Sequence, residues 1–245
     1  MPPCKRSVIG TRNESTLHRQ LKKEYAGNDG RTEVELSGFV ADAVNSAGQH
    51  IEVQIGSFGP LKKKAGELAA RGGLRVICPI IVVKHLEVFD ERGRLQSRKK
   101  SPKYGSVWDL FSSLVYAPEL PRLPGLEIEL AMVEVAEERV PDGRGSRRRG
   151  GMSIRDRRML VLHERICLKK PSDYLRFVPF ARGEEFTSKI FKEKAKIRVT
   201  LARKVLYVLA KLGVVEKIGR RQTAYVYRLA LSSRSKKWKK PAKPS

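Results

Sequence analysis

The stretch Phe39–Val44 reads FVADAV, and the stretch Ile51–Gln54, after a polar loop, reads IEVQ. Both are short, mostly apolar and bounded by turn-forming residues, which is typical of two strands joined by a hairpin. Each carries one acidic residue among apolar neighbours, Asp42 in the first and Glu52 in the second. A carboxylate inside an apolar strand is costly unless it has a partner or a function, so this pair is the first candidate for a site.

The two carboxylates are expected to converge. Side chains alternate along a strand, so Glu52 and Gln54 share one face. If the hairpin loop, expected at Asn45–Gln49, holds an odd number of residues, Asp42 lies opposite Glu52 on that face, about 5 Å away. Like charges at this separation repel unless a divalent cation joins them, and such oxygen ligands suit Mg²⁺ or Mn²⁺. We therefore expect a metal-dependent site on this face of the hairpin.

The flanking segments predict a mixed sheet covered by helices. A helix should begin near Glu14 and end near Gly27, because Leu17, Leu21 and Tyr25 recur at helical spacing. The continuous apolar run 74–83 predicts a strand that is buried on both faces, and a helix before it implies a parallel crossover. Other elements are expected at 32–36 (strand), 61–71 (helix), 86–89 and 95–97 (hairpin), 107–116 (helix) and 126–135 (strand).

Further candidates lie on the two helices that flank this hairpin. Glu14 is on the same stripe as Leu17, so we expect it to act as a third metal ligand and catalytic residue, with Glu24 as its competitor. Alternatively, Glu14 only complements the helix dipole. His18 lies one turn later on the same helix. It either approaches a phosphate group of a substrate at this site or has a structural role. Lys62 could supply positive charge at the start of the next helix, as could Lys63 or Lys64, unless these lysines only form a solvated face.

Charge is unevenly distributed along the 245 residues. The net charge is +25, yet residues 1–140 hold 21 Lys and Arg against 18 Asp and Glu, whereas residues 141–245 hold 30 against 8. A field of one sign points to a polyanion, most often nucleic acid. We interpret the Gly- and Arg-rich segment 141–158 as a linker. Its residues Arg147, Arg148 and Arg149 are expected to clamp phosphates, unless they form only a solvated loop.

The C-terminal region predicts two helices and a hairpin. Leu201, Val205, Leu209 and Leu212 mark the second helix, and Gly213 ends it. This arrangement resembles a winged helix-turn-helix domain, in which the second helix enters the major groove and the hairpin, or wing, contacts the backbone or minor groove. The resemblance implies that DNA contacts Arg198, Arg203, Lys204, Tyr207, Arg220 and Arg221. The alternative is a winged helix that binds protein.

The front region resembles the PD-(D/E)xK nuclease superfamily, also called restriction-endonuclease-like, over about residues 13–83. That superfamily places an Asp at one strand, a Glu-x-Lys on the next and often a Glu on the preceding helix. Asp42, Glu52 and Glu14 match these positions. Gln54 stands where Lys is usual, and Asp42 follows Ala41 rather than Pro. The resemblance implies metal-assisted hydrolysis of a phosphodiester, in which Gln54 orients the water that the metal ion activates. The whole chain also resembles a bacterial family without an assigned activity.

Together these patterns predict an α/β chain of two domains. The expected parts are an arm (1–13), a nuclease-like domain (14–140), the linker (141–158), a winged-helix domain (159–231) and a basic tail (232–245). Three dispersed cysteines argue against disulfides and zinc sites. The sequence has no run of 18 apolar residues and no apolar signal region, so we expect a cytoplasmic, nucleoid-associated protein that contacts no membrane.

The expected function is a DNA endonuclease that requires Mg²⁺ (or Mn²⁺) and acts on duplex or branched DNA. A non-catalytic regulator or accessory factor with a degenerate nuclease fold is the main alternative. An unrelated α/β domain with structural carboxylates and an RNA-binding protein are weaker ones. A homodimer is left open, since cutting both strands of a duplex favours two active sites.

Overall fold

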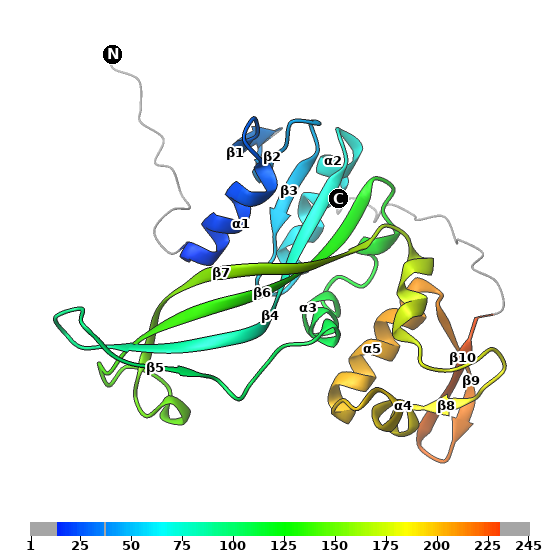
Figure 1. The fold of residues 1–245 in the computed structure, drawn as a ribbon. Coiled ribbons are helices and arrows are strands. Elements are labelled where there is room, and N and C mark those ends of the chain that lie inside the picture. The colour runs from blue at the N-terminus through cyan, green and yellow to red at the C-terminus, as the bar shows by residue number, and fades with distance from the viewer. Residues whose placement is uncertain (1–13, 37, 231–245) are drawn as a thin grey trace, which may run out of the picture.

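The computed structural model describes residues 14–36 and 38–230, and its centre is a mixed β-sheet flanked by helices (Figure 1). Seven strands run in the order β1-β2-β3-β4-β6-β7, with β5 paired to β4 outside this path. The strands are β1 (Arg31–Leu36), β2 (Phe39–Val44), β3 (His50–Val53), β4 (Leu74–Phe89), β5 (Leu95–Lys100), β6 (Leu126–Val140) and β7 (Ser153–Leu168). The α/β class with a mixed sheet is therefore confirmed, while the arm 1–13 and the tail 232–245 lie outside the described residues.

Strand directions follow the expected order. Strands β1, β2 and β3 form an antiparallel meander, and β3 then pairs in parallel with β4. Strand β6 is parallel to β4 and antiparallel to β7. The segment between β3 and β4 carries a helix, because a parallel pair needs a crossover connection and cannot be closed by a tight turn.

Helix α1 (Thr16–Ala26) covers one face of the sheet. The side chain of Ser15 caps its first turn by accepting a hydrogen bond from the His18 N–H, and Gly27 ends it with a φ of 73°. Leu17 and Leu21 are fully buried, as their spacing predicted. The sheet residues in the same core layer include Ala43, Ile51, Val53, Ile77 and Val133.

The opposite face is covered by short helical segments. Where we expected one helix over 61–71, the chain forms a 3-10 helix, η2 (Gly59–Lys63), and then α2 (Ala65–Ala70). Where we expected a helix over 107–116, a 3-10 turn (Val107–Asp109) precedes α3 (Leu110–Leu114), and a further 3-10 turn spans Leu120–Arg122. The break falls at Lys64, which ends η2 and precedes α2 and whose φ of −113° departs from helical geometry.

Three strands extend well past these helices. Strands β4, β6 and β7 are 15 or 16 residues long, and with β5 they form a sheet arm that Figure 1 shows on the left. Charged side chains are buried in this arm. Glu137 is only 1% exposed and pairs with Lys84, Arg139 and Arg157. These hydrogen bonds and charges hold the pKa of Glu137 at about 2 against the opposing effect of burial.

The expected linker at 141–158 is wrong. Strand β6 continues to Val140, a turn containing a 3-10 segment (Arg147–Arg149) follows, and β7 returns along β6 from Ser153. The glycines form a hairpin instead of a flexible connection. A Cβ on Gly145 would lie 1.7 Å from the Met152 carbonyl oxygen, and Gly150 and Gly151 have positive φ. The expected boundary at 159 therefore cuts through a strand of the central sheet.

The remaining chain forms a smaller helical unit with its own sheet. It comprises a 3-10 segment η6 (Pro171–Phe177), β8 (Phe186–Thr187), α4 (Ser188–Ala195), α5 (Val199–Leu212), β9 (Val215–Arg221) and β10 (Ala224–Leu229). Its three strands are ordered β8-β10-β9. Figure 1 shows this C-terminal unit beside α3. An aromatic cluster joins the two parts, because Trp108 stacks edge-on against both Phe177 and Phe191.

Candidate functional site

The two predicted carboxylates meet where β2 and β3 stop pairing. The ladder between these strands holds two pairs, Ala43↔Ile51 and Val44↔His50, and the same register places Asp42 opposite Glu52. Side chains take the place of the next ladder bonds. The Val53 N–H donates to Asp42 Oδ2 at 2.8 Å. The carboxylate of Asp42 is therefore fixed at the edge of β3 by the main chain itself.

Lys64, at the end of η2, reaches the same point where β2 and β3 stop pairing. Its Nζ lies 2.7 Å from Glu52 Oε1 and donates to the Val40 carbonyl at 2.9 Å. We call Asp42, Glu52, Gln54 and Lys64 the fork site. Of the three lysines considered, only Lys64 reaches a carboxylate, whereas Lys62 is exposed. A 3-10 helix has three residues per turn, so Lys64 shares the inward side with buried Leu61, and the choice of Lys62 is corrected.

Glu52 has an unusual proton affinity. Its side chain is buried, and burial together with repulsion from Asp42 raises its pKa to about 7, against the opposing effect of Lys64. A carboxyl with a pKa near neutrality exchanges protons readily at neutral pH, which is the property required of a general acid or base. Burial would also raise the pKa of Asp42, but hydrogen bonds from His18 and the Val53 N–H lower it. The two neighbouring carboxyls therefore differ in proton affinity.

His18 connects α1 to the fork site. Its Nε2 lies 3.3 Å from Asp42 Oδ2 and 3.0 Å from the Val53 carbonyl, and its Nδ1 lies 2.5 Å from Glu14. Burial favours a lower pKa for His18, but the hydrogen bonds to Asp42 and Glu14 outweigh it and raise the pKa to about 9. The ring is therefore an imidazolium at neutral pH, and it holds Asp42 ionised and in place.

Glu14 does not lie where a third metal ligand was expected. Its carboxylate pairs with His18 and with Lys22, the latter at 2.7 Å, so it reaches Asp42 only through the imidazole ring. The competitor Glu24 pairs with Arg165 on β7 instead. Across residues 14–36 and 38–230, no group of three or more His, Cys, Asp or Glu side chains is placed to hold a metal ion. The three-carboxylate cluster of Asp42, Glu52 and Glu14 is therefore corrected to two carboxylates and a histidine.

Gln54 directly follows β3, two residues after Glu52. Its main-chain N–H donates to the Ile77 carbonyl, which continues the pairing of β3 with β4 by one residue. Its side-chain Nε2 donates to the Ser57 carbonyl at 2.6 Å and so holds the following turn. The amide oxygen is the atom through which Gln54 could receive a hydrogen bond from a water.

The titration of His18 gives a prediction about stability. Because folding raises its pKa from 6.5 to about 9, its contribution is complete below pH 6.5 and is lost as the pH rises through 9. We expect the free energy of unfolding to fall by about 2–3 kcal/mol across this interval, and by much less in His18→Gln. Urea denaturation over a pH series measures it. Glu52 contributes in a separate pH window. Because folding raises its pKa from 4.5 to about 7, its contribution to the free energy of unfolding is lost as the pH rises through that interval. Equal pH dependence of the two proteins above pH 7 would contradict the assignment to His18.

The region that contains the fork site matches a known family model. Residues 15–169 match the domain of unknown function DUF8091. The chain belongs to this family. A relative from Treponema pallidum (strain Nichols), described as an uncharacterised protein, is 29% identical over 153 residues. That alignment covers 62% of this chain and 61% of the relative, so the chain spans less than two thirds of the relative's length. No solved structure matches the chain significantly.

The matched region ends at the last residues of the central sheet, so the C-terminal unit lies outside it. Within that unit, α5 buries most of its surface between the unit's own core and the sheet-side helices. Of the residues we expected to contact DNA, Arg203 and Tyr207 are exposed along one stripe of α5 and Lys204 is half-buried. Arg198 is exposed just before the helix.

The β9–β10 hairpin carries an exposed cationic cluster, which sequence reasoning found only in part. The tip residues Arg220 and Arg221 are exposed as expected. The added feature is Tyr225, whose ring has Lys217 Nζ at 4.0 Å and the Arg220 guanidinium at 4.5 Å from its centroid. The alternation of Tyr225 with inward Val226 is the signal that could have identified it.

The arginines of the Gly- and Arg-rich segment 141–158 also match the expectation only in part. Arg147 and Arg148 are exposed at the tip of the β6–β7 hairpin, whereas Arg149 is half-buried and donates to the Met152 carbonyl. Further along, Arg157 and Arg158 pair with the buried Glu137 and Glu87. These two arginines therefore neutralise buried carboxylates inside the sheet arm.

Among the described residues, no helix is long and apolar enough to cross a membrane.

Proposed function

We propose that this protein binds DNA and hydrolyses phosphodiester bonds at the fork site in a metal-dependent reaction. The observation that carries the proposal is the convergence of Asp42, Glu52 and Lys64 where β2 and β3 separate. It supports the resemblance to PD-(D/E)xK nucleases. The lysine that this superfamily usually carries on the strand is absent at Gln54, but Lys64 brings an ammonium group to Glu52 from the adjoining helix.

The donor atoms at the fork site fit one Mg²⁺ (or Mn²⁺). Asp42, Glu52 and the Val53 carbonyl offer hard oxygen atoms, and Mg²⁺ is usually held by one or two carboxylates together with substrate phosphates. When bound, such an ion polarises the phosphoryl group and lowers the pKa of a water. Lys64 contributes positive charge for the phosphate, Gln54 orients a water through its amide oxygen, and Asp42 and Glu52 would hold the ion as carboxylates. His18 positions Asp42.

The C-terminal unit would hold the duplex. The order β8-α4-α5-β9-β10 supports the resemblance to a winged helix-turn-helix domain, with α5 toward a groove and the β9–β10 hairpin toward the backbone. The exposed stripe of Arg203 and Tyr207 provides a donor and an aromatic ring, and Arg220 provides a cation for phosphate. Because much of α5 is already buried, only this narrow stripe is offered to DNA.

Incubation of the purified protein with plasmid and branched DNA tests the proposal. We expect nicked or linear products with Mg²⁺ or Mn²⁺ and none with a chelator, because the two carboxylates repel each other and the phosphate unless a cation is present. Cleavage that is unaffected by the chelator would contradict the assigned chemistry.

A second candidate is a DNA-binding protein without catalysis. The observation that favours it is the Lys64–Glu52 ion pair, together with the lack of a three-residue metal group among the described residues. In this case Lys64 would replace the cation and neutralise the site permanently. Tight DNA binding without cleavage under all metal conditions would support it.

A further inference from the structure

A surface cavity lies next to the fork site, at a gap in the sheet. Strand β3 ends near Gln54, whose N–H bonds to the Ile77 carbonyl. The same edge of β4 is next contacted at Ile81, whose carbonyl accepts the Gly105 N–H. Pro79 lies between Ile77 and Ile81 and has no N–H to donate, so this gap does not offer an edge on which another strand can pair with β4. The cavity, of about 290 Å³, opens at this gap.

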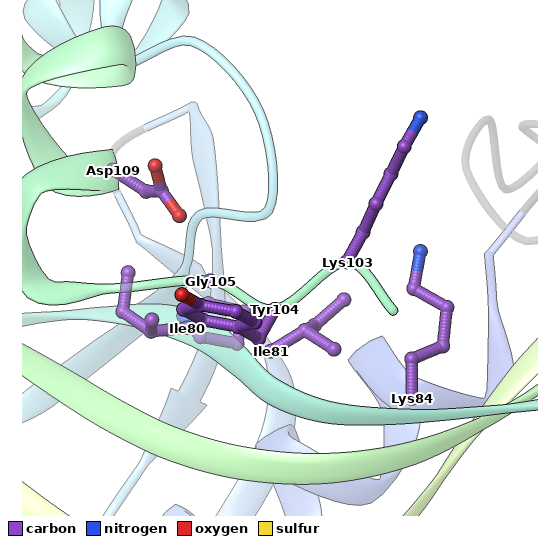
Figure 2. Close-up of a pocket in the computed structure, with 8 residues that line it drawn as sticks. Ile80, Ile81, Lys84, Lys103, Tyr104, Gly105 and Asp109 are labelled. Atoms are coloured by element: carbon purple, nitrogen blue, oxygen red, sulfur yellow. The ribbon is translucent and has the colours of Figure 1, made fainter. Parts of the chain in front are cut away.

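The lining of the cavity has three chemical zones, which Figure 2 shows in order. Asp109 lies on one side, Lys84 and Lys103 extend together on the other, and the ring of Tyr104 lies between them over the strand. Tyr104 is 79% exposed, so its ring is open to a ligand. Ile80 and Ile81 form the apolar floor.

The lysine end has a surplus of positive charge. Lys84 pairs with Glu137 at 3.3 Å, but this carboxylate is shared with two arginines and is therefore more than neutralised. Lys103 is exposed, and no carboxylate within 14–36 or 38–230 pairs with it. An anion at this end would meet two ammonium groups.

The acidic end is suited to a hydrogen-bond donor. One oxygen of Asp109 accepts the Ser106 N–H at 3.0 Å, which fixes the carboxylate, and the other oxygen remains able to accept. Carboxylates in proteins read amino groups on nucleobases in this way. A Cβ at Gly105 would lie 2.8 Å from the Ile81 carbonyl oxygen, so the loop approaches the strand as closely as only glycine allows.

We propose that this cavity binds one unpaired nucleotide of a nucleic-acid strand. The base stacks on Tyr104 with its amino edge at Asp109, and the phosphate lies at Lys103 and Lys84. Stacking on an exposed aromatic ring beside cations is how proteins hold single-stranded nucleic acid. The cavity lies about 10 Å along β4 from the partner of Gln54, at three residues of strand rise, so the same strand could continue to the fork site. The inference extends the proposed function but requires only nucleic-acid binding, not cleavage.

The test uses the full-length protein, a chelator and a short single strand containing 2-aminopurine, whose fluorescence is quenched by stacking. We expect Tyr104→Ala to weaken the quenched complex about tenfold, the loss of one stacked base, and Tyr104→Phe to change it less than about twofold. Tyr116→Ala is the matched control, because it removes another exposed tyrosine ring that does not line this cavity and should leave the quenching in place. Thermal melting checks that the variants are folded.

The alternatives give different results. Undiminished quenching in Tyr104→Ala, or its loss in Tyr116→Ala instead, overturns the proposal. A free mononucleotide that competes as well as the strand overturns the assignment to a strand. An oligothymidine competitor, which lacks an amino group, should be weaker than oligocytidine, and equal competition overturns the role of Asp109. Tyr104-dependent binding without any metal-dependent cleavage would contradict the proposed nuclease and leave this inference standing. Metal-dependent cleavage without Tyr104-dependent quenching would overturn this inference and leave the proposed nuclease standing.

Discussion

Asp42→Asn and Glu52→Gln are each expected to lower the rate of DNA cleavage by about a hundredfold to a thousandfold while leaving DNA binding nearly unchanged. Both substitutions keep the size of the side chain and remove its negative charge. In Asp42→Asn the amide oxygen would still accept the Val53 N–H, so the strands should keep their register. The lost quantity is the affinity of the fork site for the cation. Single-turnover cleavage with saturating protein measures the rate, and fluorescence anisotropy measures binding.

Two controls separate chemistry from binding and folding. Glu24→Gln removes a carboxylate from α1 that pairs with Arg165 away from the fork site, so cleavage should be unchanged. Tyr225→Ala combined with Arg220→Ala should weaken binding but leave the rate at saturation near that of the wild type. Cleavage at the wild-type rate in both Asp42→Asn and Glu52→Gln would remove the fork site from the mechanism.

Much of the sheet-side fold could be predicted from local patterns. The spacing of Leu17 and Leu21 marked α1, and the apolar run after residue 74 marked a strand buried on both faces. The register that opposes Asp42 to Glu52 followed from alternation and an odd loop length. These predictions succeeded because each rested on the spacing of residues within a short segment, although the contacts that bury these segments come from distant parts of the chain.

The failures have a common cause, because each depended on geometry that short-range patterns do not carry. Glycines and arginines in 141–158 have the same composition in a hairpin as in a linker, and only the pairing of β7 with β6 distinguishes them. Lys64 rather than Lys62 reaches Glu52, because η2 is a 3-10 helix. Glu14 was assigned to a metal because the sequence did not show that His18 would lie between it and Asp42.

Phe111→Ala is expected to lower the free energy of unfolding by about 3–5 kcal/mol, the usual cost of removing a buried phenylalanine ring. Phe111 is fully buried on α3, and its ring lies edge-on to Phe177 at 5.0 Å between centroids. It also contacts Trp108, which in turn packs against Phe191 on α4. The substitution therefore opens a cavity in the core shared by the central sheet and the C-terminal unit.

The same variant tests whether the two parts of the molecule act as one. A shared core predicts a single unfolding transition, shifted as a whole in Phe111→Ala, when tryptophan fluorescence and circular dichroism are followed in urea. Tyr104→Ala is the control, because an exposed ring should change stability by less than about 0.5 kcal/mol. Two separate transitions, or a loss below about 1 kcal/mol, would show that α3 does not fix the C-terminal unit. The exposed stripe of α5 would then have no set distance from the fork site, and a bound duplex could not be presented to Asp42 and Glu52 in a defined register.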